Sequence, residues 1–346
     1  MSIKQSTVLS CIQPTAEMHI GNYFGAIENW VHLQKDYSCI YGIVDLHAMT
    51  MPYEPSHLRE YTNRMAIDLL ACGIDPEETI LFIQSLVPEH SALCWILSCY
   101  CSFGELGRMA QFKEKSEQLE AGKRGQFVSA GLFTYPVLQA ADILIYRAKY
   151  VPVGKDQEQH LELSHKIARR FNNVVNQPFF PECEPLFTET PKIMSLADPN
   201  QKMSKNLGAK HYIGLFEEEQ SIREKIGAAV TDTGALPPGV EMSPGVANLF
   251  EILRACGKKD EEALLLEDYR TGNLKYVHLK QVVSDAVVEL TGTLRAKREE
   301  IFSNAEDVEL RVREMSEKAR IIAAETLSEV HDLIGLPQRD QGKIEV

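Results

Sequence analysis

Strand-like and helix-like segments alternate along roughly the first 200 residues of the chain. Apolar runs of the kind found in buried strands occupy residues 7–12, 39–44, 79–83 and 150–153. Segments with helical spacing of apolar residues lie between and after these runs, at residues 22–35, 55–72, 88 to about 119, 133–146 and 156–171. Strands that alternate with helices usually form a parallel sheet covered on both faces. The order of segments therefore predicts an α/β domain.

The second part of the chain has a different pattern, in which helices follow one another without strands. After about residue 206, helical segments are predicted at 217–229, 245–256, 261–269 and most of 277–334. Residues 234–244 form a break rich in glycine and proline between two of these helices. A chain of 346 residues is also longer than one ordinary domain. We therefore expect an α/β domain followed by an all-helical domain.

The charge of the chain limits the partners that it can bind. Its net charge is −13, so the overall basic surface of a general nucleic-acid coat is absent. An RNA could still dock on a local basic patch. The candidate patches are Lys166 with Arg169 and Arg170, and the run of Lys113, Lys115, Lys123 and Arg124. Solvated helix faces are the simpler interpretation of each patch.

Apolar segments and cysteines indicate the compartment. No segment has the apolar length of a signal peptide or a membrane span, so we expect a cytoplasmic protein without membrane association. Several of the eight cysteines lie in apolar runs, as small core residues do. The tightest group, Cys94, Cys99 and Cys101, has neither a zinc-site spacing nor an evident fourth ligand. We expect buried thiols and no protein metal site.

The first peptide with a chemical signature is Pro14–Asn22, which lies between a predicted strand and a predicted helix. Nucleotides bind at such positions in open parallel sheets, outside the carboxyl ends of the strands. Gly21 leaves room for a ligand near the backbone, and the start of the following helix favours an anion. His19 can donate to a phosphate oxygen without a permanent charge. Taken alone, a loop histidine is the simpler interpretation.

The second peptide is Lys202–Asn206, which places two ammonium groups on a loop. Asp198, Pro199 and Asn200, just before it, are typical turn residues. A mobile basic loop suits a polyphosphate whose charge shifts during displacement. Taken alone, the two lysines are an ordinary surface pair. Together, in this order, the two peptides indicate a site that activates a carboxylate with ATP.

Both peptides resemble motifs of one enzyme class. Residues His19–Asn22 resemble the HIGH element of class I aminoacyl-tRNA synthetases, and Lys202–Asn206 resembles their KMSKS loop. Further segments resemble bacterial tryptophanyl-tRNA synthetases in order and spacing: Gln13–Thr15, Val44–Ala48, Tyr135–Pro136, Ala140–Leu144, Val151–Gln157 and Gln159–Leu163. The resemblance covers nearly the whole chain. It implies a Rossmann-like catalytic domain in residues 1–200, with a dimer-interface insertion, and a KMSKS-type loop with a helical anticodon-binding domain in residues 201–346. The C-terminal helices could pack back on the catalytic domain.

The resemblance implies which residues bind ATP, which is expected as a complex with Mg²⁺ and without a tightly bound cofactor. These residues are Gln13, Pro14, Thr15, Gly21, Asn22, Gly154, Lys155, Asp156, Ile193, Lys202, Met203, Ser204, Lys205 and Asn206. The catalytic residues that it implies are His19, Lys115, Lys202, Ser204 and Lys205. Lys115 resembles a family lysine that meets the leaving phosphates.

The resemblance also implies a tryptophan site. Its residues are Leu9, His47, Tyr135, Gln139, Asp142, Val151, Val153 and Gln157. Asp142 would accept the indole N–H, a donor that needs a partner once it is buried. Asp142 could instead cap a helix or form a salt bridge. Its place in an apolar run argues against a solvent-facing role, because a buried carboxylate needs a donor.

The reaction implied by the resemblance has two steps. The tryptophan carboxylate attacks the α-phosphate of ATP in line, and pyrophosphate leaves. The terminal ribose hydroxyl of tRNA(Trp) then attacks the aminoacyl-adenylate. Alignment and charge stabilisation by the protein suffice, without a covalent enzyme nucleophile. The resemblance further implies a homodimer in which tRNA crosses between subunits, with much of the interface in Pro88–Glu105.

Three positions depart from the family pattern. Ala16 stands where the family usually has glycine, and Asn206 replaces the final serine of KMSKS. Leu9 occupies a position where an aromatic residue often covers the indole. We expect these departures to tune rates and fit without abolishing activity.

Two alternative functions remain open at this point. A tyrosyl-tRNA synthetase shares the fold, and Tyr135, Gln139 and Asp142 would also suit tyrosine. Leu9 argues against it, because tyrosine enzymes place a phenol-binding tyrosine there, and the Val151–Gln157 stretch also favours tryptophan.

The second alternative is a non-catalytic, synthetase-like protein that binds RNA. Such a protein would be expected to lose the histidine or the lysines of the two motifs. The chain retains His19, Lys202 and Lys205, which favours the enzyme.

Overall fold

A computed structural model describes residues 5–15, 17–121, 127–152, 154, 157–186, 190–232 and 242–337. Its first part is built on a five-stranded sheet in the order β3-β2-β1-β4-β5, with every pairing parallel. The strands are β1 Gln5–Ile12, β2 Tyr37–Ile43, β3 Thr79–Ile83, β4 Tyr150–Pro152 and β5 Glu184–Leu186. The sequence predicted the first four and the parallel pairing, and these predictions are confirmed.

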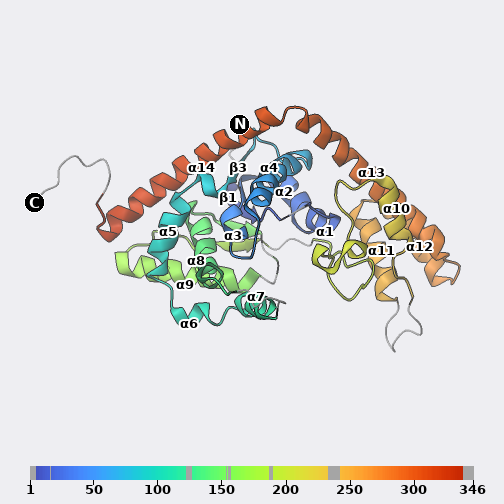
Figure 1. Ribbon diagram of the computed structural model, residues 1–346, viewed down its shortest axis with the longest axis horizontal. Coiled ribbons are helices and arrows are strands. Elements are labelled where there is room, and N and C mark those ends of the chain that lie inside the picture. Colours follow the sequence, from blue (N-terminus) through green and yellow to red (C-terminus); the bar gives the residue numbers. More distant parts are fainter. Residues whose placement is uncertain are drawn as a thin grey trace, which may run out of the picture.

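The helices of the first part follow the predicted alternation and cover the sheet (Figure 1). Their bounds are α1 Ile20–Asn22, α2 Glu28–Leu33, α3 Asp45–Ala48, α4 Pro55–Ala71, α5 Glu89–Ser98, α6 Phe103–Leu106, α7 Ala110–Glu120, α8 Ala130–Ile145 and α9 Glu158–Val175. The π-helix η1, Tyr23–Ile27, joins α1 to α2 without a break, and the 3₁₀ turn η2, Gln84–Leu86, follows β3. The helical stretch predicted from residue 88 to about 119 is thus divided into three helices.

Aromatic packing fixes the segment from α1 to α2 on the sheet. The ring of Trp30 stacks on that of Tyr41 in β2, with centroids 4.5 Å apart and planes 7° from parallel. The hydroxyl of Tyr41 donates to the backbone oxygen of Trp30 at 2.9 Å. Offset aromatic pairs of this kind add to the stabilisation from burial. The start of this helical segment, which carries the first motif, is therefore held at a fixed place beside the sheet.

The second part is helical, as predicted. It consists of the 3₁₀ turns η4 Lys205–Leu207 and η5 Ala209–His211 and the helices α10 Glu219–Gly227, α11 Pro244–Ala255, α12 Lys259–Arg270, α13 Tyr276–Phe302 and α14 Ala305–Ile334. Most of the predicted break at 234–244 lies outside the described residues. The long segment predicted at 277–334 is interrupted at Ser303 and Asn304, where the chain turns at an open angle (Figure 1).

The two long helices pack in different places. Helix α13 lies along α10 and α11, whereas α14 runs back over β3 and α5 (Figure 1). The backbone N–H of Ile83 in β3 donates to the hydroxyl of Ser316 in α14 at 3.1 Å. Ala319 and Ala323 are fully buried in the same apolar cluster as Phe82 of β3. The last helix therefore completes the core of the first part of the chain.

A buried ion pair also joins the two parts. The guanidinium of Arg298 in α13 lies 2.7 Å from the carboxylate of Asp68 in α4 and 4.4 Å from the ring centroid of Phe216. Asp68 is only 2% exposed. Burial raises the pKa of Asp68 to about 6, although Arg298 and Arg64 oppose this change. Asp68 is therefore a carboxyl group whose charge depends on Arg298.

Candidate active site

The residues of the candidate site follow the carboxyl ends of four neighbouring strands. The first motif follows β1, and His47 in α3 follows β2. Gln84 in η2 follows β3, and Gly154 and Gln157 follow β4. Strand order runs outward in both directions from β1, because β2 lies on one side of it and β4 on the other. Ligands of open α/β sheets bind in the crevice at such a reversal of order.

His19 caps the helix that begins at Ile20. Its Nδ1 accepts from the backbone N–H of Asn22 at 3.2 Å, and Asn22 Oδ1 accepts from the backbone N–H of His19 at 3.1 Å. Because Nδ1 is an acceptor, the proton of the neutral ring is on Nε2. Burial, together with the charges of Lys205 and Lys202, lowers the pKa of His19 to about 4. At neutral pH the ring is an uncharged donor, as the sequence suggested.

Gly21 lies where the two motifs meet. A Cβ atom at this position would be 3.0 Å from Nδ1 of His19 and 3.5 Å from Cβ of Met203. A side chain would therefore press on the nitrogen that caps the helix and on the second motif. These contacts within the protein are sufficient to explain why residue 21 is a glycine. That Gly21 also leaves space for a ligand stays a prediction.

The second motif begins at the end of a short hairpin. Met194 and Lys202 form an antiparallel bridge, and the backbone N–H of Met203 donates to the oxygen of Ile193 at 3.2 Å. Asp198 accepts from the backbone N–H of Asn200 at 3.2 Å, so the predicted turn is present. Ile193 and Met203 are buried, whereas Lys202 is exposed. The hairpin thus anchors the motif and leaves Lys202 in solvent.

The rest of the second motif reaches the first one. The ammonium of Lys205 donates to the backbone oxygen of Thr15 at 3.4 Å and to that of Glu17. The carboxylate of Glu17 forms an ion pair with Arg64 of α4. Burial lowers the pKa of Lys205. The hydroxyl of Ser204 accepts from the backbone N–H of Asn206 at 3.3 Å. The departure at position 206 therefore leaves this backbone contact in place.

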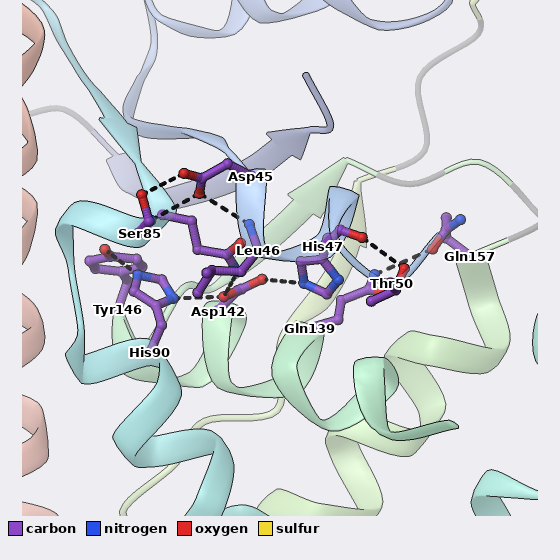
Figure 2. A network of polar contacts seen from close by, with 11 residues as sticks. Asp45, Leu46, His47, Thr50, Ser85, His90, Gln139, Asp142, Tyr146 and Gln157 are labelled. Atoms are coloured by element: carbon purple, nitrogen blue, oxygen red, sulfur yellow. Dashed lines mark hydrogen bonds and ion pairs between the residues drawn. The ribbon is translucent and has the colours of Figure 1, made fainter. Parts of the chain in front are cut away.

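Asp142 in α8 is 2% exposed and is held by three side chains (Figure 2). Its Oδ2 lies 2.9 Å from Nε2 of His47. Its Oδ1 lies 2.6 Å from Nδ1 of His90 and 2.8 Å from Nε2 of Gln84. Burial alone would raise the pKa of Asp142, but the hydrogen bonds from His47 and His90 hold it well below its usual range. Asp142 is therefore a buried, ionised acceptor.

The other α8 residues predicted for the tryptophan site share a face with Asp142. Tyr135 and Gln139 precede it by seven and three positions, which places all three on one side of the helix. The ring centroids of Tyr135 and His47 are 6.2 Å apart. Gln139 Nε2 donates to Oε1 of Gln157 at 3.3 Å (Figure 2). The structure therefore gathers these predicted side chains around one place.

Lys115 lies on the same side of the site. Its ammonium is 5.1 Å from the ring centroid of Tyr135, and burial lowers the pKa of the amine. The hydroxyl of Tyr135 also donates to Gln111 at 3.2 Å and lies 2.8 Å from Nε2 of His160. Lys115 therefore lies beside Tyr135, one of the residues predicted for the tryptophan site.

Leu9 and Val151 are buried in one apolar cluster with Ala140 and Ala141 of α8. They thus form an apolar wall next to the helix that carries Asp142.

Gln13, Pro14 and Gly154 are at the strand ends described above. Of the other residues singled out from the sequence, several lie outside the described residues: Ala16, Lys123, Arg124, Val153, Lys155 and Asp156.

Three residues around Asp142 were not predicted from the sequence. Gln84 and His90 bond its Oδ1, and Nε2 of His90 lies 2.8 Å from the hydroxyl of Tyr146. One signal was available, since Gln84 is the first residue after the β3 run, at the edge where polar functional residues gather. His90 and Tyr146 carry no such signal because each lies inside a helical segment.

One of the candidate basic patches is neutralised by acidic neighbours. Lys166 pairs with Glu162 at 2.7 Å, Arg169 with Glu182 at 2.6 Å, and Arg170 with Glu105 at 2.7 Å. The solvated helix face was the better interpretation of this patch.

The described part of the chain has neither a metal-binding cluster nor a membrane-spanning helix. No group of three or more histidine, cysteine, aspartate or glutamate residues there lies close enough to hold a metal ion. No helix in it has the length and apolar character needed to cross a membrane.

A cavity of about 1250 Å³ lies in the angle between α13 and α14, against α4. Its walls include Asp45 at the start of α3 and Arg64, the partner of Glu17. His19, Asp142 and Lys205 do not line it. The cavity therefore adjoins the candidate site without containing its central residues.

Comparisons with known proteins agree with this fold and show the family. Residues 1–292 match the family model of class I tRNA synthetases for W and Y. The tryptophan–tRNA ligase 2 of Streptomyces avermitilis is 42% identical over 341 residues, which cover 97% of this chain and 98% of that protein.

Two solved structures are also similar. The tryptophanyl-tRNA synthetase of Campylobacter jejuni, in complex with ADP and tryptophan, has a TM-score of 0.81 and 32% identity, covering 95% of this chain and all of that one. The enzyme of Mycoplasma pneumoniae has a TM-score of 0.82 and 32% identity, covering 96% and 98%. The chain therefore belongs to the class I aminoacyl-tRNA synthetases, and within them to the bacterial-type tryptophanyl-tRNA synthetases.

Proposed function

We propose that the site activates L-tryptophan with ATP and transfers it to the 3′ end of tRNA(Trp), with the residue roles given below. The observation that carries these roles is the position of Asp142. This ionised carboxylate is buried at the carboxyl edge of the sheet. The two motifs predicted to bind ATP contact each other at the same edge, at the end of β1. Membership in the tryptophanyl family supports the same substrates.

In the first step, the two motifs would hold the phosphates. His19 offers Nε2–H as a neutral donor, while Lys202 and Lys205 supply positive charge from the loop. Lys202 is exposed and can bind a phosphate directly. Lys205 would give up its contact with the backbone oxygen of Thr15 and bind a phosphate oxygen in its place. Donors aimed at developing charge lower the barrier of phosphoryl-centre displacement. Mg²⁺ would arrive with ATP, sharing the phosphate charge with few protein ligands.

On the amino-acid side, Asp142 would accept the indole N–H. Leu9 and Val151 would contact the apolar ring, while Tyr135 and Gln157 would contact the amino group. A buried acceptor discriminates strongly, because a ligand without the matching donor leaves it unpaired. Tyrosine could reach Asp142 with its phenol, but apolar Leu9 would give that hydroxyl no second partner.

For the second step, we propose that the helical domain, residues 201–346, receives the anticodon of tRNA(Trp). The exposed apolar residues Leu264 and Val277, on α12 and α13, offer contact surface in this domain.

We propose that the protein acts as a homodimer through Pro88–Glu105. Within this segment, Trp95 is 76% and Phe103 is 79% exposed. Large exposed aromatic residues are typical of interface cores. The opposite side of α5, with Leu93 and Leu97, is fully buried in the core. The segment would thus connect the core of one subunit to its partner. Sedimentation of the wild type and of Trp95→Glu tests the dimer.

We also propose that the protein works in the cytoplasm. All eight cysteines lie within the described residues and are free thiols, which suits a reducing compartment.

The decisive test is amino-acid-dependent exchange of labelled pyrophosphate into ATP. Exchange with tryptophan but not with tyrosine is expected. Exchange with tyrosine alone would establish the tyrosyl alternative, and exchange with neither would favour a non-catalytic RNA-binding protein. Charging of tRNA(Trp) transcripts then tests the second step.

A further inference from the structure

We propose that His90, held in place by Tyr146, is a positioning residue that aims the Asp142 carboxylate and leaves Oδ2 as the acceptor for the indole N–H. This inference rests on the proposed function, since it assigns a role within the tryptophan site. His90 and Tyr146 lie behind Asp142 as seen from His47, and the three side chains form a continuous line (Figure 2).

The hydrogen bonds determine the tautomer of His90. A carboxylate can only accept, so Nδ1 of His90 carries the proton that bonds Asp142 at 2.6 Å. In the neutral ring, Nε2 is then the acceptor for the hydroxyl of Tyr146 at 2.8 Å. Burial raises the pKa of Tyr146, which keeps that hydroxyl protonated as a donor. Tyr146 therefore keeps the Nδ1 proton of His90 directed at Asp142.

Packing also restrains the His90 ring. His90 is fully buried, and its ring stacks on that of Phe82 with centroids 5.3 Å apart and an interplanar angle of 25°. Phe82 comes from β3 and Tyr146 from the end of α8. A ring held by two neighbours loses little further freedom when it bonds the carboxylate. Supporting residues of this kind keep a functional group within the narrow geometry that recognition requires.

The donors are divided unequally between the two carboxylate oxygens. Each oxygen of an ionised carboxylate can accept about two hydrogen bonds. Oδ1 already accepts from His90 and Gln84, whereas Oδ2 accepts from His47 alone among the residues that the structure describes. The remaining acceptor position is thus on Oδ2, beside His47. Since the ring of His47 also approaches that of Tyr135, this position faces residues predicted for the tryptophan site.

The test compares two variants with two ligands. His90→Asn keeps an amide N–H near the place of Nδ1, whereas His90→Leu removes the donor at similar volume. The ligands are tryptophan and 3-benzothienylalanine, in which sulfur replaces the indole N–H. The KM for tryptophan is measured by pyrophosphate exchange, and the Ki of the sulfur analogue by competition.

His90→Leu should raise the KM for tryptophan at least about tenfold, the change expected for one hydrogen bond to a charged group. The Ki of the analogue and the KM for ATP should change less than about threefold. His90→Asn should restore most of the tryptophan affinity. A similar loss for both ligands in His90→Leu would overturn the proposal and leave His90 a structural role.

If His90→Leu does not fold, Tyr146→Phe tests the positioning role of His90. It keeps the ring and removes only the hydroxyl that orients Nε2. The ratio of analogue Ki to tryptophan KM should fall, and an unchanged ratio would overturn the proposal. Failure of the wild type to exchange pyrophosphate with tryptophan would instead reject the proposed function, so the two failures are distinguishable.

Discussion

The ammonium of Lys205 lies 3.4 Å from the backbone oxygen of Thr15, although the two residues are 190 positions apart in the chain. This contact joins the motif after β1 to the motif at the start of the helical part. An ammonium group that is bound to neutral backbone oxygens can leave them for a phosphate, which carries more negative charge. ATP would therefore compete with the backbone oxygens of Thr15 and Glu17 for the ammonium of Lys205.

Lys205→Met should lower kcat for pyrophosphate exchange by roughly 10²- to 10³-fold, as is typical for loss of one transition-state donor. The KM for tryptophan should change little, because Lys205 does not contact Asp142 or its neighbours. Lys210→Met, on the exposed turn η5, is the matched control and should retain activity. A large effect on tryptophan KM with unchanged kcat would contradict this role.

Asp142→Ala should weaken tryptophan binding by roughly 10- to 100-fold, the range for hydrogen bonds to a charged group. ATP binding should be nearly unchanged, because the described partners of Asp142 are His47, Gln84 and His90, none of which is predicted to bind ATP. Asp142→Asn keeps the shape of the side chain. It should also weaken the binding of tryptophan but not of ATP, with a smaller loss of folding stability than Asp142→Ala. Calorimetric titration of each ligand measures both effects, and equal loss of both ligands would assign Asp142 a structural role.

The folded protein should lose stability as pH falls from about 6.5, in part because of His19. Its pKa of about 4 in the folded state lies below the ordinary value, so the unfolded chain binds the proton first. The stabilisation is therefore complete above pH 6.5 and is lost as pH falls towards 4. Between pH 6.5 and 5, this group accounts for about 2 kcal/mol.

Chemical unfolding at several pH values, compared with His19→Asn, measures this contribution. The variant should show a shallower dependence on pH, while exposed His278→Asn should follow the wild type. If the free energy of unfolding depends on pH in the same way in the wild type and in His19→Asn, His19 does not titrate as stated.

Arg298→Met should destabilise the protein by about 3–5 kcal/mol, as expected when one partner of a buried ion pair is removed. It would leave the carboxylate of Asp68 buried without its nearest charge partner. Asp68→Asn added to Arg298→Met should recover much of this loss. Arg313→Met breaks only an exposed pair with Glu309 and should cost less than about 1 kcal/mol. Urea unfolding compares these variants with the wild type and with Asp68→Asn alone, and additive losses in the double variant would contradict the coupling.

Much of the fold followed from the sequence, because apolar strands and amphipathic helices have different periods. Strand β5 was missed because its three residues, Glu184–Leu186, have neither alternation nor an apolar run. The turn at Ser303 and Asn304 was missed because neither glycine nor proline marks it. Both elements depend on tertiary packing that overrides a weak local signal.

The site was predicted unevenly for a similar reason. His19 and Lys205 lie in linear motifs, so their residue types and order could be recognised. The partners of Asp142 are distributed over several elements, with Gln84 after β3 and His90 in α5. Nothing in the linear chain ties these residues to Asp142, which lies more than 50 positions away from either.

The return of α14 over β3 has a consequence for synthesis of the protein on the ribosome. β3 is an edge strand, and its cover arrives 233 positions later, when Ser316 reaches the backbone of Ile83. Through most of translation, the part of the apolar cluster around β3 that α14 covers therefore stays exposed. The first part of the chain therefore completes its core only after the last helix has been synthesised, and until then its uncovered apolar surface favours association.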